Sequence, residues 1–271
     1  MDGTPSSYAI ALACERVGKG EPVVLLHGVT TSSFIWRRIV PQLAPHYEVI
    51  TVDHLGFGAS PRDLAADASV GAHAERAAAL LRELAPGPVH LVGHDVGGAV
   101  AQLIAARHPD LVRDLSLLNT VGYDYWPVQL VATLRAPIIR SLSFATLNRH
   151  ALALIVRRGL YHKDRATEEL LDLFYGQVSA PEARKPFMQF IRALDHRSTA
   201  EALPGLVRSG VEVLIVRGDA DVYLTSRIAE RLHEDLPGSR LVRIPTAGHF
   251  LQEDEPELVS RALLDFFRRH D

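Results

Sequence analysis

The feature that most constrains the fold is a glycine-rich turn at residues 93–98 (GHDVGG), which joins an apolar run to a segment of small residues. The run 89–92 has the character of a buried strand, and 99–107 has that of a helix. So sharp a turn holds its central residue, Asp95, in a cramped backbone conformation that is tolerated only between small neighbours. The sequence therefore predicts a strand, a tight turn and a helix, with the Asp95 side chain raised above a sheet edge.

The carboxylate at the tip of this turn stands where a serine nucleophile is usual. Serine attacks carbonyl carbon, whereas a carboxylate oxygen can displace a leaving group from saturated carbon and leave an alkyl ester on the protein. Because the reference pKa of aspartate is about 3.9, Asp95 needs no base to become a nucleophile near neutral pH. A base is needed afterwards, to direct water onto the ester.

Length and composition indicate one globular domain with room for an inserted subdomain. The chain has 271 residues, of which 47% are hydrophobic and 23% charged. A net charge of -3 gives no reason to expect a nucleic acid or an anionic membrane as a partner, so a small molecule is expected. The composition of residues 122–203 predicts that this small molecule is a hydrophobic substrate. No window reaches the roughly 18 uninterrupted apolar residues of a membrane span.

The single cysteine, Cys14, excludes an internal disulfide and a cysteine-rich metal site, and it favours a cytoplasmic location. It ends the apolar run 9–14, which follows no Lys or Arg and is too short for a signal peptide. We interpret this run as the first strand and Cys14 as a small buried residue within it.

Short β-rich runs alternate with segments of helical periodicity along most of the chain. The runs are apolar almost throughout, which is typical of parallel strands buried on both faces: 23–26, 49–53, 89–92, 115–118, 211–216 and 241–244. The helical segments are 33–43, 72–84, 99–107, 226–236 and 256–269. This alternation predicts an α/β fold in which helices flank a mostly parallel, twisted sheet.

The alternation stops after Asn119. From residue 122 to about 203 no strand pattern appears, and apolar residues recur at helical spacing. We predict that residues 122–203 form a helical cap subdomain inserted into a core of residues 1–121 and 204–271.

Three polar residues are predicted to follow strand ends. Asp95 follows the run 89–92, Asp221 follows 211–216, and His249 follows 241–244. Ligands of open α/β sheets gather at the carboxyl ends of the strands, so these three side chains should face one crevice.

Four further motifs accompany the turn around Asp95: HGVTTSSFIW from His27, DHLGFGAS from Asp53, GDAD ending at Asp221, and GHFLQEDEP around His249. With these motifs in this order, the chain resembles the α/β-hydrolase superfamily over essentially its whole length. Within it, the chain resembles the branch with an aspartate nucleophile, the epoxide hydrolases and haloalkane dehalogenases. The motifs are a specific signal for the fold and a weaker one for the substrate.

The resemblance implies a role for each residue of the constellation. Asp95 is implied as the nucleophile, His249 as the base that activates water, and Asp221 as the carboxylate that fixes the imidazole tautomer. The backbone N–H groups of Val29 and Val96 are implied as an oxyanion hole that stabilises ester breakdown.

Other polar residues of the motifs are expected to be structural. Some haloalkane dehalogenases place the acid after the sixth strand, where this chain has Asn119, so Asp221 is favoured. We interpret His27, His54 and His94 as framework residues and Asp53 as an organiser of its loop.

The chain departs from these relatives at positions that bind the leaving group. Relatives that expel halide usually carry Trp directly after the nucleophile and a second donor, often Asn, after the His-Gly pair. Here these positions are Val96 and Val29. Fluoroacetate-type dehalogenases carry arginines at the positions of Val96 and Ala99. These apolar side chains offer no hydrogen-bond donor, so haloalkane and haloacid substrates are disfavoured.

Epoxide opening needs a proton donor for the leaving alkoxide, which in epoxide hydrolases is a cap tyrosine with a pKa of about 10. We predict a substrate pocket lined by Tyr123, Tyr125, Trp126, Tyr161 and Tyr175. The first two tyrosines and Trp126 lie next to the cap entrance and are favoured. The spacing leaves open which tyrosine is the donor.

The leading prediction is a cofactor-free hydrolase that attacks saturated carbon through an alkyl ester on Asp95, an epoxide hydrolase for an apolar substrate. No metal is expected, because no His and Asp cluster has ligand spacing. Three alternatives stay open: a haloalkane dehalogenase, a lyase or cyclase that uses Asp95 as a base, and a non-enzymatic ligand receptor. The oligomeric state is open as well.

Overall fold

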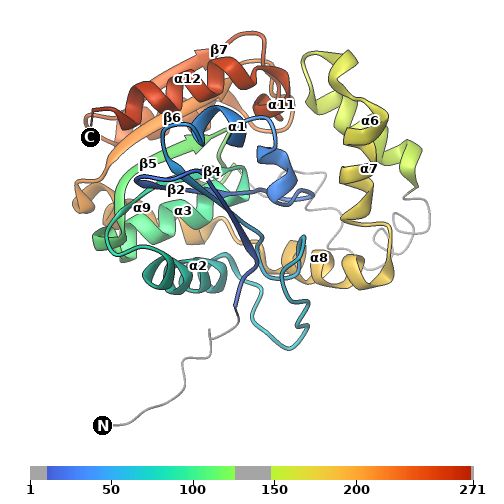
Figure 1. The fold of residues 1–271 in the computed structure, drawn as a ribbon, viewed down its shortest axis with the longest axis horizontal. Helices are drawn as coiled ribbons and strands as arrows, with labels where there is room; N and C mark the ends of the chain where they lie inside the picture. The colour runs from blue at the N-terminus through green and yellow to red at the C-terminus, as the bar shows by residue number, and fades with distance from the viewer. Residues whose placement is uncertain (1–10, 126–147, 270–271) are drawn as a thin grey trace.

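The computed structural model describes residues 11–125 and 148–269, and Figure 1 shows their fold. A seven-stranded sheet forms its centre, in the order β1-β3-β2-β4-β5-β6-β7. β1 pairs antiparallel with β3, and every other neighbouring pair is parallel. The strands are β1 (Cys14–Val17), β2 (Pro22–Leu26), β3 (Glu48–Val52), β4 (Val89–His94), β5 (Val112–Leu118), β6 (Glu212–Gly218) and β7 (Arg240–Ile244).

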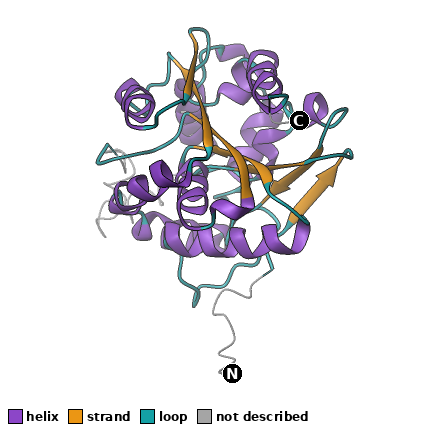
Figure 2. Cartoon of the chain, turned by 90° about the vertical axis from the view of Figure 1, so that its left-hand side faces the viewer, coloured by secondary structure: helices purple, strands orange, loops and turns teal. Residues whose placement is uncertain are grey.

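Helices cover both faces of this sheet, as Figure 2 shows from the side. α2 (Val70–Leu84), α3 (Val96–Arg107) and α9 (Arg197–Ser209) pack together on one face. α1 (Val40–Leu43) and α12 (Pro256–Phe267) pack together on the other face. β4 is consequently buried along its whole length, which explains its apolar sequence. The predicted α/β fold with a mostly parallel sheet is confirmed.

The remaining elements of the core are short or flank the last strands. α10 (Ser226–Asp235) packs against β6 and β7, and the others are η1 (Ser33–Trp36), η2 (Pro109–Leu111) and α11 (Leu251–Asp254). In the described ranges, no helix is both long enough and apolar enough to cross a lipid bilayer.

A helical insertion separates β5 from β6. It contains α6 (Arg149–Gly159), η3 (Lys163–Arg165), α7 (Glu168–Gly176) and α8 (Pro181–Ala193), with no strand between residues 148 and 203. α9 follows and packs on α3, where a side chain at Gly205 would meet Ala106 at 3.2 Å. The predicted boundary at residue 203 thus falls inside a helix that rests on the core.

Two local predictions are wrong. The first strand begins at Cys14 rather than ending there, and Cys14 is exposed, because β1 is an edge strand whose four residues all face solvent. The predicted helix 33–43 is divided into η1 and α1. Pro41 explains the break, since proline has no N–H to donate to the preceding turn and is tolerated only in a first turn, its place in α1.

Candidate active site

The turn between β4 and α3 holds Asp95 at φ 54° and ψ -120°, a conformation that L-residues rarely adopt. The flanking glycines are required by close contacts: a Cβ atom at Gly93 would lie 2.5 Å from the carbonyl oxygen of Gly97. A Cβ at Gly97 or Gly98 would overlap the end of β2 or the side chain of Thr120. The sequence-predicted turn is therefore the one that the fold contains, and it raises Asp95 at the carboxyl edge of the sheet.

The loop after β2 packs directly on the Asp95 side chain. A Cβ atom at Gly28 would lie 2.5 Å from Asp95 Cβ, so only glycine leaves room for the carboxylate. The backbone N–H of Val29 donates to Asp95 Oδ1 at 2.9 Å, and the N–H of Val96 also donates to this carboxylate. The two N–H groups expected to form an oxyanion hole thus already bind the Asp95 carboxylate.

His249 lies between the two aspartates. Its Nδ1 donates to Asp221 Oδ2 at 3.0 Å, and its Nε2 lies 3.9 Å from Asp95 Oδ2. The longer distance is beyond a direct hydrogen bond. All three residues are buried, at 6–8% exposed. The structure brings together Asp95, Asp221, His249, Val29 and Val96, as the sequence predicted.

The charges of this site shift its pKa values. Burial raises the pKa of Asp95, although His249 and the two N–H donors oppose the shift. Burial alone lowers the pKa of His249, but the charges of Asp221 and Asp95 and the hydrogen bond to Asp221 raise it overall. For Asp221, burial is outweighed by His249, Arg217 and backbone N–H donors, so its pKa is lowered. Asp221 is therefore the carboxylate that stays ionised against the imidazole.

Asn119 holds the framework around the histidine rather than acting as its acid. Its Oδ1 accepts the N–H of Gly218 at 2.9 Å, while its Nδ2 donates to the carbonyl oxygens of Gly248 and His249 at 2.8 and 3.0 Å. The residue after β5 thus joins the end of β6 to the loop that follows β7. These partners lie 99 to 130 positions away in the sequence, so no local pattern reports them.

The framework histidines are buried and hydrogen bonded. His94 Nε2 donates to the carbonyl oxygen of His249 at 3.0 Å, and His27 Nε2 accepts the N–H of His54 at 3.0 Å. Burial, the largest cause, lowers the pKa of His27 to about 4 and that of His94 to about 3. Asp53 likewise organises its loop, since its carboxylate accepts the N–H groups of Ser33 and Ala59.

The predicted pocket tyrosines differ in their surroundings. The Tyr123 hydroxyl donates to Asp235 Oδ2 at 2.9 Å beneath a stacked arginine, and Tyr161 is 46% exposed. Tyr125 and Tyr175 are half-buried, and no described residue hydrogen bonds to either hydroxyl. Trp126 lies outside the described residues.

An aromatic row joins α7 of the helical insertion to His249. The Phe174 ring of α7 lies 5.1 Å from Phe34 and 4.8 Å from Phe250, and Phe250 lies 4.9 Å from His249. These edge-to-face contacts give the His249 side of the site an apolar wall.

Tyr223 is a site residue that sequence analysis missed. Its ring stands at 89° to the His249 ring, with centroids 5.3 Å apart, and its N–H donates to Asp221 Oδ1 at 2.8 Å. In the sequence, its position two residues after Asp221 could have identified it as a site residue.

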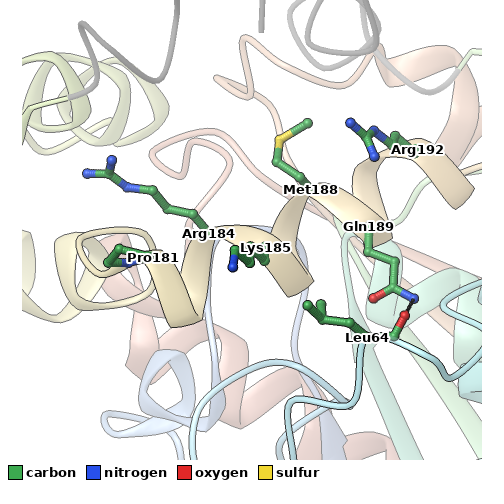
Figure 3. Close-up of a pocket in the computed structure, with 7 residues that line it drawn as sticks. All are labelled: Leu64, Pro181, Arg184, Lys185, Met188, Gln189 and Arg192. Carbon is green, nitrogen blue, oxygen red and sulfur yellow. Dashed lines mark hydrogen bonds between the residues drawn. The ribbon is translucent and has the colours of Figure 1, made fainter. Parts of the chain in front are cut away.

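A separate groove runs along the exposed side of α8, as Figure 3 shows. It has a volume of about 530 Å³, and Asp95, His249 and Asp221 do not line it. Arg184, Lys185 and Arg192 line it beside Leu64 and Met188. Within the part of the chain that the structure describes, no three His, Cys, Asp or Glu side chains gather in a way that could hold a metal ion.

Comparison with known proteins supports the fold. Residues 21–256 match the sequence profile of a family described as the alpha/beta hydrolase fold. Haloalkane dehalogenase 2 of Mycobacterium tuberculosis is 27% identical, over 92% of this chain and 89% of its own length. The 2-hydroxy-6-oxo-2,4-heptadienoate hydrolase of Pseudomonas putida is 28% identical, over 94% and 92%.

Solved structures extend the comparison. The epoxide hydrolase CorEH superimposes with a TM-score of 0.83 over 97% of this chain and 99% of its own. At 22% identity, this match shows a shared fold alone. From its sequence profile and its architecture, the chain belongs to the α/β-hydrolase fold family.

Proposed function

We propose that the protein is a cofactor-free hydrolase that opens an epoxide of an apolar small molecule through an alkyl ester on Asp95. The observation that carries the proposal is the different placement of the two carboxylate oxygens. Oδ1 accepts the N–H of Val29 at 2.9 Å, while Oδ2 faces His249 Nε2 at 3.9 Å. Oδ1 is held by an N–H donor, and Oδ2 is left for attack on carbon.

In the first step, Asp95 Oδ2 attacks a ring carbon of the epoxide. The new O–C bond forms as the ring C–O bond breaks, and the electron pair leaves on the alkoxide oxygen. That oxygen takes a proton from a tyrosine hydroxyl. Tyr125 and Tyr175 are the candidates, because the hydroxyl of Tyr123 is already bonded to Asp235.

In the second step, His249 takes a proton from water, and the hydroxide adds to Cγ of the ester. Negative charge develops on Oδ1, where the N–H of Val29 is in place to stabilise it, with the N–H of Val96 as a second donor to the carboxylate; one such donor contributes about 3 kcal/mol. The Cγ–Oδ2 bond then breaks, and the imidazolium returns its proton to the departing alkoxide. The diol leaves with Oδ2, and the water oxygen remains in Asp95. The second water proton, left on the new Asp95 carboxyl group, passes through solvent to the tyrosinate and restores both residues.

The preference for an apolar substrate follows from the wall beside His249. Phe34, Phe174 and Phe250 form that wall, and the side chains of Val29 and Val96 flank the nucleophile without a polar group. Binding pockets of this composition favour apolar ligands.

The decisive experiment uses His249→Gln, which keeps the nucleophile and removes the base. We expect styrene oxide to add its mass to this variant, and peptide mapping to place the adduct on Asp95. The double variant Asp95→Asn, His249→Gln is the matched control and should gain no mass. Turnover of the epoxide without any adduct would contradict the ester.

A single turnover of the wild-type protein in heavy-oxygen water tests the same proposal independently. The ester route puts the heavy oxygen into Asp95 and leaves the product unlabelled. Label in the product instead would favour direct attack of water with Asp95 as a general base, and label in neither would favour the lyase or cyclase alternative. Unchanged ligand binding and biological effect in Asp95→Asn, without turnover, would favour a receptor.

A haloalkane dehalogenase is the second candidate, and the similarity to haloalkane dehalogenase 2 of Mycobacterium tuberculosis favours it. The chemistry of the first step is the same, with halide as the leaving group. Val29 and Val96 supply no side-chain donor to hold that anion. Rapid release of bromide from bromohexane, measured with a halide electrode, would replace the epoxide proposal with this one.

A further inference from the structure

A buried carboxylate outside the proposed mechanism joins the cap to the loop that carries His249. Asp254 Oδ2 accepts the N–H groups of Gly248 and Tyr161, each at 2.8 Å, and Oδ1 accepts the N–H of His162 at 2.8 Å. Asp254 is only 1% exposed. Three N–H donors satisfy the buried charge, two of them from the turn after α6 and one from the residue before His249.

The backbone of the same turn contacts the histidine itself. The N–H of His249 donates to the carbonyl oxygen of Gly159, the last residue of α6, at 2.7 Å. Gly248 approaches this carbonyl so closely that a Cβ atom there would overlap it. The end of α6 and the His249 loop therefore lie in direct backbone contact. Figure 1 shows α6 beside α11, the short helix that follows His249 and ends at Asp254.

Tyr223 forms a second link between the cap and the catalytic loops. Its hydroxyl donates to the carbonyl oxygen of Ile155 in α6 at 2.6 Å, while its ring packs edge-on against His249. A side chain at Gly159 would come within 2.8 Å of this ring. The tyrosine thus spans from α6 to the Asp221 loop, where its N–H binds the carboxylate.

On the core side, the carbonyl oxygen of His249 accepts bonds from Asn119 Nδ2 and His94 Nε2. The His249 backbone is consequently held from the core through its carbonyl and from the cap through its N–H. Among these contacts to the backbone of the His249 loop, the carboxylate of Asp254 lies on the cap side.

We propose that Asp254 is a positioning residue, which holds the His249 loop against the end of α6 so that the imidazole stays aligned between Asp221 and Asp95. This assignment rests on the proposed function. A displacement of about 1 Å at a reacting group can reduce a rate about a hundredfold. Because Asp254 acts through His249, its loss should slow ester hydrolysis more than ester formation.

The test is the pKa of His249, measured by NMR titration of its ring protons in wild-type protein and in Asp254→Asn. The charged groups around this ring are Asp95, Asp221 and Arg217, with His94 beside it. An asparagine cannot accept all three N–H bonds, so the loop should shift and weaken the contact with Asp221. We expect the pKa of His249 to fall toward its ordinary value, because the contact with Asp221 is the main opposite charge that raises it.

Glu257→Gln is the matched control, since it removes an exposed carboxylate three residues further along and should leave the pKa of His249 unchanged. An unchanged pKa in a folded Asp254→Asn protein would overturn the proposal. The titration uses no substrate, so its outcome does not depend on the adduct experiment. If no adduct forms on Asp95, only the proposed alkyl ester is rejected, and the role of Asp254 is still tested by the titration.

Amide hydrogen exchange in the wild-type protein covers the case in which Asp254→Asn does not fold. The N–H groups of Gly248, Tyr161 and His162 share one acceptor residue, so we expect them to open together and to exchange with similar protection. If those of Tyr161 and His162 exchange at least about a hundredfold faster than that of Gly248, the turn after α6 opens independently, and the proposal is wrong.

Discussion

Mild acid should destabilise the fold through histidines that are buried and neutral. Burial, the largest cause, lowers the pKa of His27 to about 4 and that of His94 to about 3. In an unfolded chain each has a pKa of about 6.5. The unfolded state therefore binds these protons first. The stability that each histidine contributes is complete above about pH 6.5 and is lost as the pH falls toward its folded-state pKa.

The magnitude follows from the width of that window. Each pH unit below about 6.5 costs about 1.4 kcal/mol per histidine. At about pH 5 both folded-state pKa values lie lower still, so each histidine accounts for about 2 kcal/mol and the pair for about 4 kcal/mol. A domain is typically stable by about 5 to 15 kcal/mol, so the loss is large. The raised pKa values of Asp95 and His249 act in the opposite direction over this range.

The assay is urea unfolding at about pH 7.5 and about pH 5, followed by tryptophan fluorescence. His27→Gln and His94→Gln should each lose about 2 kcal/mol less than wild type between the two pH values. The pH-independent effect of each substitution cancels in this difference. His46→Gln, at an exposed histidine, is the control and should behave as wild type. If both buried variants lose as much stability as wild type, these rings do not resist protonation and the reasoning is refuted.

Two further predictions concern the turn and its chemistry. Gly98→Ala should destabilise the protein by about 2 kcal/mol or more, because the new methyl group overlaps Thr120, while Gly87→Ala in open space should be neutral; thermal unfolding measures both. The ester should accumulate more in wild-type protein at about pH 6 than at about pH 8.5, because the raised pKa of His249 keeps more of this base protonated at the lower pH. Intact mass after rapid acid quench reports it, and equal ester levels at both pH values would exclude His249 as the base.

Local sequence was sufficient for the turn around Asp95 and for the strands beside it. A backbone at φ 54° with neighbours in van der Waals contact admits only small residues, and the three glycines report this directly. Strands buried on both faces must be apolar, so β2, β4 and β5 were visible as runs. The placement of Asp221 and His249 after strands followed from the same reasoning.

Residue type did not determine which tyrosine hydroxyls already have a hydrogen-bond partner, or which side chains are exposed to solvent. Tyr123 and Tyr125 look equivalent in the sequence, yet only the fold ties Tyr123 to Asp235, 112 positions away. Cys14 carries no signal of its exposure, because exposure depends on β1 being an edge strand.

The sequence by itself determined the strand-turn-helix around Asp95, the parallel sheet and the order of the three polar residues, because these depend on local sterics and periodic burial. Only the tertiary structure decided the contacts of Asn119, Tyr223 and Asp254, because their hydrogen-bond partners come from other strands and from the cap. A hydrogen bond between distant segments leaves no periodicity in either one, so the fold must exist before such a contact can be known.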